Sequence, residues 1–375
     1  MACPPHARKG VGAILVGLRP SVVACTQPQP RPADNDGDTT TVELNQYPIE
    51  HDSLSSVVFS REEIYGELMH LEARDSFLIA TDRHGDPFVH VVDAATGKLI
   101  KSMGRHGAGP GEFAGFPFVV AGADTASRLW LFETSGQRLV RLDLISLSFV
   151  QPGAAGSWTV RLAPRYVYAV AVLGSSLVGA VDSMGHQRLA AFDTTGLDHA
   201  TLVTISYADD RLPRDRLSPA YHHPICVRPS GDRVGFGYVN AGLVQLVDLE
   251  QRTTTDAAVP FRFRPQFSPH PATGQPIWAS GSTSRRAYGD CAATATHFVA
   301  IFSGRLRRAA DYNAWPKRYT SWVHFFTWDG TLDRVLRLDH YATSLALDPQ
   351  GRYIYTIAED STGFRLIRRT PIAPQ

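Results

Sequence analysis

The sequence predicts an all-β protein, a six-bladed β-propeller with four-stranded antiparallel blades. Apolar positions alternate with period two from about residue 55 onward, and clusters of Gly, Asp, Asn and Ser interrupt the alternation. One strongly apolar strand also recurs about every 55 residues, a spacing typical of propellers and solenoids. The alternative is a β-sandwich or two small β domains, which the regular spacing of the units disfavours.

Each repeat has one central strand rich in β-branched and aromatic residues. The six central strands are Phe77–Asp82, Arg128–Glu133, Ser176–Asp182, Arg233–Val239, His297–Phe302 and Tyr353–Asp360. A partly apolar segment such as Phe116–Gly122 supplies an inner strand before it, and segments such as Leu243–Asp248 and Leu332–Arg337 supply outer strands after it. Four strands in each of six units define a propeller that closes radially.

The last unit has only three strands, ending at Phe364–Arg369. We therefore expect an N-terminal strand to close this blade, either Thr40–Leu44 or Ser55–Phe59. On this interpretation the propeller occupies residues 40–375.

The N-terminus has the order of a secretory signal, with basic residues, the apolar stretch Gly10–Leu18 and small residues before Cys25. Val22-Val-Ala-Cys25 resembles a bacterial lipobox, which implies cleavage before Cys25 and lipidation of that cysteine. The alternative is a frayed N-terminus with an incidental Ala-Cys, and Arg19-Pro20 does interrupt the apolar stretch.

These features divide the chain into three parts. Residues 1–24 are predicted to be a signal peptide of the lipoprotein type. Residues 25–39 are Pro-rich and polar and are predicted to form a disordered tether before the propeller.

A Gly-rich segment, Gly104-Arg-His-Gly-Ala-Gly-Pro-Gly-Glu-Phe113, lies between the outer strand of one unit and the inner strand of the next. It resembles the blade junction of NHL-type propellers. With the lipobox and six units, the mature chain resembles the TolB-like six-bladed propeller lipoproteins of bacteria. The resemblance implies a fold and a place in the cell envelope, at the periplasmic or outer-surface side of the outer membrane. A phosphate-binding loop is disfavoured because a strand pattern, not a helix, follows the glycines.

Composition excludes several classes of function. Lys and Arg number 37 against 36 Asp and Glu, whereas a nucleic-acid-binding protein usually carries a basic excess. The mature chain also has no apolar run of the ~18 residues that a spanning helix needs. We expect a monomer that meets the membrane only through its lipid anchor.

Long insertions suggest a binding face. Ala208–Tyr221, Pro260–Arg286 and Gly304–Ser321 fall in loops that open on one face of a propeller, where they would form a lid. The predicted ligand-binding residues, in this lid and at the mouths of the inner strands, are Arg165, Tyr166, His223, Arg286, Tyr288, Trp315, His340 and Tyr341.

Cations beside aromatic rings suit an anionic or carbohydrate-like ligand. The alternative is that these side chains only pack and hydrogen-bond between blades. A further interpretation makes the insertions a docking surface for another envelope protein.

We therefore expect an extracytoplasmic ligand-binding or interaction scaffold without a cofactor, and we favour a non-enzymatic role. The alternative is a lactonase-like or lyase-like enzyme that uses Ca²⁺, because oxygen ligands suit that ion. Its candidate carboxylates end the central strands: Asp82, Glu133, Asp182, Glu359 and Asp360.

Two cysteines, Cys226 and Cys291, fall on the predicted inner strands of blades four and five. A disulfide requires a Cα–Cα distance below about 7 Å. The sequence leaves open whether they pair or remain two buried thiols.

Overall fold

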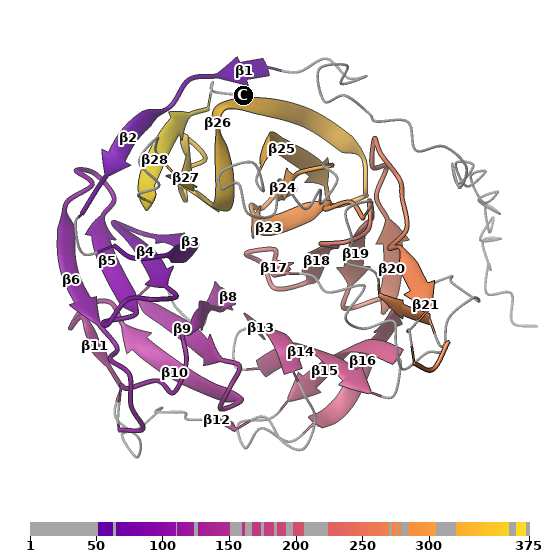
Figure 1. Cartoon of the computed structure of the whole chain (residues 1–375), viewed down its shortest axis with the longest axis horizontal. Helices are drawn as coiled ribbons and strands as arrows, with labels where there is room; N and C mark the ends of the chain where they lie inside the picture. Colours follow the sequence, from indigo (N-terminus) through magenta and orange to yellow (C-terminus); the bar gives the residue numbers. More distant parts are fainter. Residues whose placement is uncertain are drawn as a thin grey trace, which may run out of the picture. The chain divides into compact units, whose positions relative to one another are not determined.

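The structure is a computed structural model. It describes residues 52–62, 65–109, 111–123, 127–150, 160–161, 167–173, 176–183, 186–192, 198–205, 224–269, 272–274, 276–278, 284–304, 320–359 and 365–372. The chain divides into two compact units, Met1–Asp34 and Asn35–Gln375, and every described residue belongs to the second. Within those residues no helix is long and apolar enough to span a membrane. The second unit is built from β-sheets (Figure 1).

Four blades are separate antiparallel sheets. Blade one contains β3 (Leu68–Arg74), β4 (Phe77–Asp82), β5 (Val89–Asp93) and β6 (Leu99–Met103). Blade two contains β7 (Phe118–Val119), β9 (Arg128–Glu133), β10 (Arg138–Asp143), β11 (Ser148–Phe149) and β12 (Val160–Arg161). Blade three contains β13 (Val167–Leu173), β14 (Ser176–Ser183), β15 (His186–Phe192) and β16 (Asp198–Ile205). Blade four contains β17 (Ile225–Val227), β18 (Arg233–Gly237), β19 (Val244–Asp248) and β20 (Thr253–Asp256).

Blades five and six share one strand. Blade five contains β23 (Tyr288–Ala293), β24 (His297–Phe302), β25 (Thr320–Thr327) and the first part of β26 (Leu332–Leu347). Blade six contains the second part of β26, β27 (Tyr353–Glu359), β28 (Arg365–Pro371) and β2 (Val57–Ser60). All six predicted central strands are confirmed, but the outer strand predicted at Leu332–Arg337 continues to Leu347 as β26.

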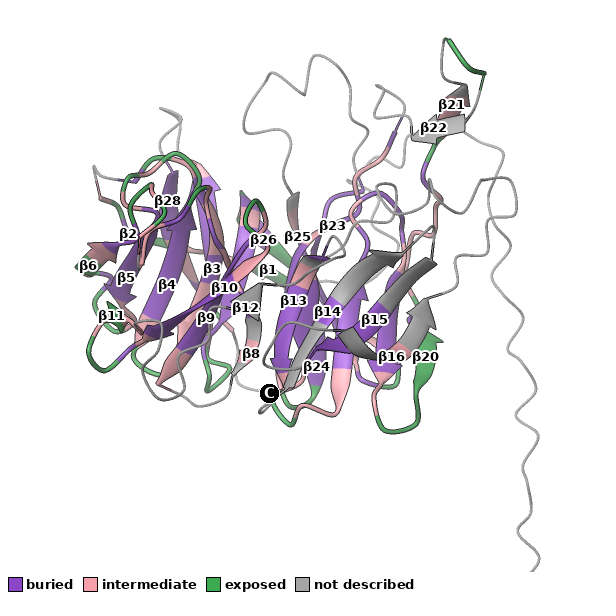
Figure 2. Cartoon of the chain, turned by 90° about the horizontal axis from the view of Figure 1, so that it is seen from below, coloured by how far each residue is buried: buried purple, intermediate pink, exposed green. Residues whose placement is uncertain are grey.

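The hydrophobic core lies between the blades. One buried cluster joins Leu71 and Leu78 of blade one to Tyr355 and Ile367 of blade six, and the other clusters join successive blades in the same way. Figure 2 shows buried residues along the strands and exposed residues at turns and at outer strands such as β20. Because blade six packs on blade one, the sheets form a closed ring (Figure 1).

The N-terminal strand closes the last blade as the sequence predicts. Strand β2 pairs antiparallel with β28, with Val57 opposite Arg369, so the alternative at 55–59 is the correct one. The Phe59 carbonyl packs against Gly97 in the β5–β6 turn of blade one. Gly97 has φ of 76°, and a Cβ there would lie 1.9 Å from that oxygen. This close approach therefore requires glycine.

The Gly-rich segment is an inter-blade turn, as expected. Gly104 and Gly111 have φ of 81° and 73°, and a Cβ on Gly111 would lie 2.5 Å from the Phe149 ring. Phe113 at its end is fully buried against Phe149 and Phe88, with ring centroids 5.6 and 6.4 Å away. The glycines let the chain pass close to these rings.

Two local features differ from the expected pattern. The predicted strand at 116–122 breaks into β7 and β8 (Ala121–Ala123), and β8 pairs parallel with β13 of blade three. Gly122, with φ of 81°, redirects the chain between the blades. The insertion at 260–286, expected as a loop, contains a small hairpin of β21 (Phe267–Pro269) and β22 (Pro276–Trp278).

Candidate functional site

A pocket lies where β26 passes from blade five to blade six. Trp322 of β25 pairs with Arg337, and Thr320 pairs with Ala342, so residues 338–341 of β26 stand opposite Ser321 alone. Such a bulge bends a strand and leaves part of its backbone outside the ladder. The bulge forms the floor of the pocket.

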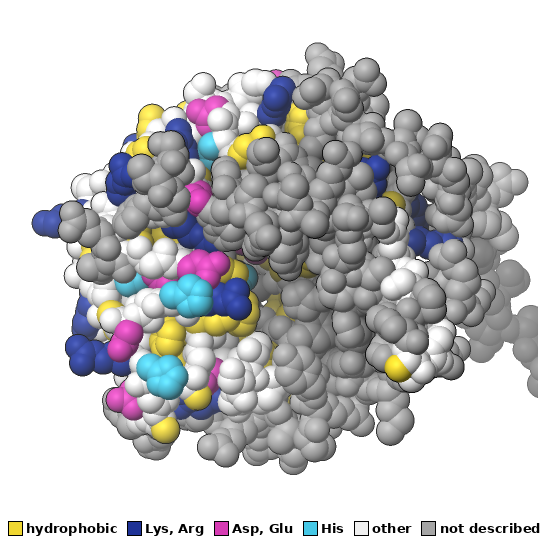
Figure 3. Space-filling model, viewed as in Figure 1, with side chains coloured by type: hydrophobic (Ala, Val, Ile, Leu, Met, Phe, Trp, Pro, Cys, Tyr) yellow, Lys and Arg dark blue, Asp and Glu magenta, His cyan; other side chains and the backbone are white. Residues whose placement is uncertain are grey.

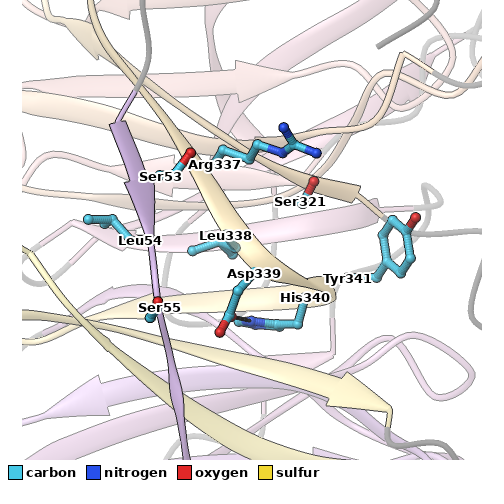
Figure 4. A pocket seen from close by; sticks show the side chains of 9 residues that line it. All are labelled: Ser53, Leu54, Ser55, Ser321, Arg337, Leu338, Asp339, His340 and Tyr341. Atoms are coloured by element: carbon cyan, nitrogen blue, oxygen red, sulfur yellow. Dashed lines mark hydrogen bonds and ion pairs between the residues drawn. The ribbon is translucent and has the colours of Figure 1, made fainter. Parts of the chain in front are cut away.

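The N-terminal segment forms the facing wall. Strand β1 (Asp52–Leu54) pairs parallel with β26, with Ser53 opposite Arg337, and Asp52 accepts a 2.9 Å hydrogen bond from Arg334. The volume is about 390 Å³, and the lining residues are Ser53, Leu54, Ser55, Ser321, Arg337, Leu338, Asp339, His340 and Tyr341. Figure 4 shows Arg337 extending from β26 to the same side as Ser321, with Leu338 and Asp339 on the other side.

A polar cluster fixes the segment between β1 and β2, and it centres on Ser56. Asp339 accepts hydrogen bonds from the Ser56 N–H at 3.0 Å and the Ser56 hydroxyl at 2.5 Å. Arg368 donates to the same hydroxyl at 2.6 Å. Burial raises the pKa of Asp339, but hydrogen bonds from His340 and Ser56 outweigh it and lower the pKa to about 2. Asp339 is therefore ionised at neutral pH.

The same cluster does not have the geometry of a catalytic triad. In a triad the serine and the carboxylate meet opposite nitrogens of the histidine ring. Here Ser56 Oγ and Asp339 Oδ1 both lie near Nδ1 of His340, at 3.0 and 2.8 Å, and Nε2 meets Thr356 Oγ1 at 2.7 Å. Ser56 and Asp339 therefore share one nitrogen of His340 and do not lie on opposite sides of its ring.

Arg337 provides a cation at the pocket. Its guanidinium lies over the buried Trp322 ring, 5.5 Å from the centroid, while the side chain itself is exposed. In the described part of the chain no carboxylate lies within ion-pair distance of it. Tyr341, with 36% of its surface exposed, lines the same pocket.

Of the predicted ligand-binding residues, the structure brings together His340 and Tyr341. Tyr288 is fully buried against Phe302 and Phe326 and does not line the pocket, which speaks against a direct ligand contact. Arg286 is half-buried just before β23 and does not line the pocket. Four predicted residues lie outside the described part of the chain: Arg165, Tyr166, His223 and Trp315. Cys25 lies outside it too.

Sequence reasoning missed Ser53, Ser321, Arg337 and Asp339. Three consecutive residues, 339–341, break the apolar alternation of β26 and are the one local signal of a bend. The contribution of Ser53 depends on pairing with a strand about 280 residues further along the chain, which no local pattern encodes.

Two of the carboxylates at the ends of central strands, Asp82 and Glu133, have local roles. Asp82 accepts N–H bonds from Glu67 at 2.8 Å and Gly85 at 2.8 Å. Glu133 accepts the Gly115 N–H at 2.9 Å and pairs with Arg138 at 2.9 Å. Among the described residues no three His, Cys, Asp or Glu side chains gather as metal ligands would.

The two cysteines left open by the sequence form a disulfide. Cys226 on β17 and Cys291 on β23 are buried, with Cα atoms 6.0 Å apart. The bond links the inner strands of blades four and five, which are 65 residues apart in the chain.

The fold and the pocket together define a closed six-bladed propeller with a pocket of ligand size where β1 pairs with β26. Residues 52–350 match the family described as TolB-like 6-blade propeller-like, and the chain belongs to this family. Comparison with curated proteins finds no match.

Among solved structures, the chain resembles a member of the DUF4221 family from Bacteroides vulgatus. The TM-score is 0.53 at 9% identity, over 85% of this chain and 98% of that one. It also resembles a putative exported protein from Bacteroides fragilis, with a TM-score of 0.50 at 8% identity, over 86% and 95% of the two chains. At these identities the likeness concerns the fold.

Proposed function

We propose that the protein is an extracytoplasmic, lipid-anchored β-propeller that acts as a binding module through the pocket between β1, β25 and β26. Fold alone does not assign a function, because propellers host many unrelated ones. The pocket is the observation that carries the proposal, since it is concave, within the usual size range of ligand sites, and lined by several polar groups.

Three features support the location. The signal, Cys25 and the tether occur in the order of a bacterial lipoprotein. The Cys226–Cys291 disulfide is typical of oxidising compartments. One of the similar structures is described as a putative exported protein.

The place of the pocket supports its use as a binding site. Its wall is β1, the first strand among the described residues, which pairs with β26 where blades five and six meet. On the face seen in Figure 3, basic, acidic and histidine side chains intermingle over the described residues without a large patch of one sign. A discrete pocket therefore explains binding better than a broad electrostatic surface.

The test is native mass spectrometry of the full-length protein after exposure to a small-molecule extract of the bacterial envelope. Ser321 stands opposite the bulge, so Ser321→Trp fills the pocket without removing a ladder pair. We expect the wild type to retain a small molecule that Ser321→Trp loses. Equal retention by the two proteins, or none by either, contradicts the proposal.

A further inference from the structure

We infer that the pocket binds a small hydroxylated anion, a sugar acid or a sugar phosphate, with Arg337 as the residue that holds its charged group. This inference rests on the proposed use of the pocket as the binding site and names the class of ligand. The carboxylate and phosphate forms share the chemistry that matters, a compact oxyanion on a polar ring.

Arg337 is arranged to bind an oxyanion. A guanidinium can stack on an aromatic face and still direct its N–H groups at a carboxylate or phosphate. Arg337 lies over Trp322, which orients it, and over the described residues it has no acidic partner. An anion entering the pocket therefore meets a cation that already stacks on Trp322.

Asp339 lines the same pocket but does not oppose an anion strongly. Its carboxylate accepts from the N–H and the hydroxyl of Ser56 and contacts His340, and Arg368 lies 3.9 Å away. The Ser56 hydrogen bonds and the nearby Arg368 guanidinium thus compensate the negative charge of Asp339. Arg337, on the other side of β26, remains to interact with a ligand (Figure 4).

The remaining lining suits a hydroxylated ring. The hydroxyls of Ser53, Ser55 and Ser321 have no hydrogen-bond partner among the described residues, and each can both donate and accept. Tyr341 adds a partly exposed aromatic ring. About 390 Å³ is at the small end of ligand sites and favours a compact ligand over a polymer.

Isothermal titration calorimetry with glucose, glucuronate and glucose 6-phosphate tests the inference, because the three probes share a ring and differ in charge. We expect the two anionic sugars to bind the full-length protein and neutral glucose not to bind. Arg337→Gln should weaken binding of the anionic sugars about tenfold to a hundredfold, the effect of losing a charge-assisted hydrogen bond. Arg352→Gln is the control, because it removes the same charge from an exposed residue that pairs with Asp348 away from the pocket. The relative affinities of glucuronate and glucose 6-phosphate distinguish a carboxylate site from a phosphate site.

The other outcomes overturn the anion site, and one of them also overturns the proposed function. Equal binding of all three sugars, unchanged in Arg337→Gln, overturns the anion site but leaves the pocket as a binding site. Loss of affinity in Arg352→Gln equal to that in Arg337→Gln reduces the effect to general charge and also overturns it. If none of the sugars binds while Ser321→Trp abolishes retention of an envelope compound, the ligand class is wrong and the proposed function stands. If neither experiment detects a ligand, both fail.

Discussion

At the scale of single residues, a histidine inside blade five is held neutral. His324 is fully buried, stacks on Phe302 with centroids 4.7 Å apart, and its Nδ1 lies 3.2 Å from the Tyr288 hydroxyl. Burial lowers the pKa of His324 to about 3. In the unfolded chain the same ring takes up a proton near pH 6.5. Protonation therefore favours the unfolded state.

Replacing His324 by Phe should change the pH dependence of stability. Below about pH 6.5 the unfolded wild type binds a proton that the folded protein does not, so its stability falls as the pH falls. The free energy of unfolding of the wild type should decrease relative to His324→Phe by about 1.4 kcal/mol per pH unit between pH 6 and 4. Urea unfolding at several pH values measures this difference. Parallel profiles for the two proteins would contradict it, and above pH 7 the profiles should be parallel in either case.

Tyr288 is a predicted ligand-binding residue that the structure places in the core. Tyr288 and Tyr341 both stand at the start of a predicted inner strand, so the sequence pattern predicts the same role for both. The pairing of β23 with β24 shifts register between Tyr288 and Cys291, and a shift of one residue exchanges the faces of a strand. Tyr288 packs in the core, whereas Tyr341 lies on a bulge at the surface.

At the scale of elements, the N-terminal strap, residues 52–60, connects three blades. Strand β1 pairs with β26 at blade five, β2 pairs with β28 in blade six, and Phe59 packs against Gly97 of blade one. Ser56 lies between the two strands and is held by Asp339 and Arg368. The strap closes the ring and walls the pocket, so loosening it should affect both.

Asp339→Asn should loosen the strap. The amide group cannot accept as the second carboxylate oxygen does, so Ser56 loses part of its bonding, at a cost of about 1–3 kcal/mol. Hydrogen exchange measured by mass spectrometry should speed up in peptides covering the strap and β28. Asp333→Asn is a matched control, since Asp333 lies on the same strand and pairs with the more distant His297 at 3.0 Å. Equal exchange in the two variants would mean that the Ser56 cluster does not hold the strap.

At the scale of the whole molecule, the fold was predictable because every blade repeats one pattern. Each central strand, such as Phe77–Asp82 or His297–Phe302, carries its own apolar alternation, and the repeat length gives the number of blades. Closure followed from the missing strand of blade six. The choice between the two N-terminal candidates did not, because both have similar patterns and the pairing with β28 decides between them.

The pocket was only partly predictable for a related reason. His340 and Tyr341 stood out as polar and aromatic residues at a strand boundary. Arg337 and Ser321 did not, since the sequence predicts an outer strand that ends at Arg337, whereas β26 continues to Leu347. A pocket made by a bulge and a distant N-terminal strand depends on tertiary pairing, which is not contained in any single window of sequence.

We propose that this propeller, with its Cys226–Cys291 disulfide, is exported and lipid-anchored. Mass spectrometry of the protein isolated from bacterial membranes tests this claim most directly, by the identity of its first residue and the state of Cys226 and Cys291. We expect a chain that begins at a lipid-modified Cys25, with Cys226 and Cys291 joined. A chain that retains Met1, lacks lipid and carries both cysteines as free thiols would contradict it.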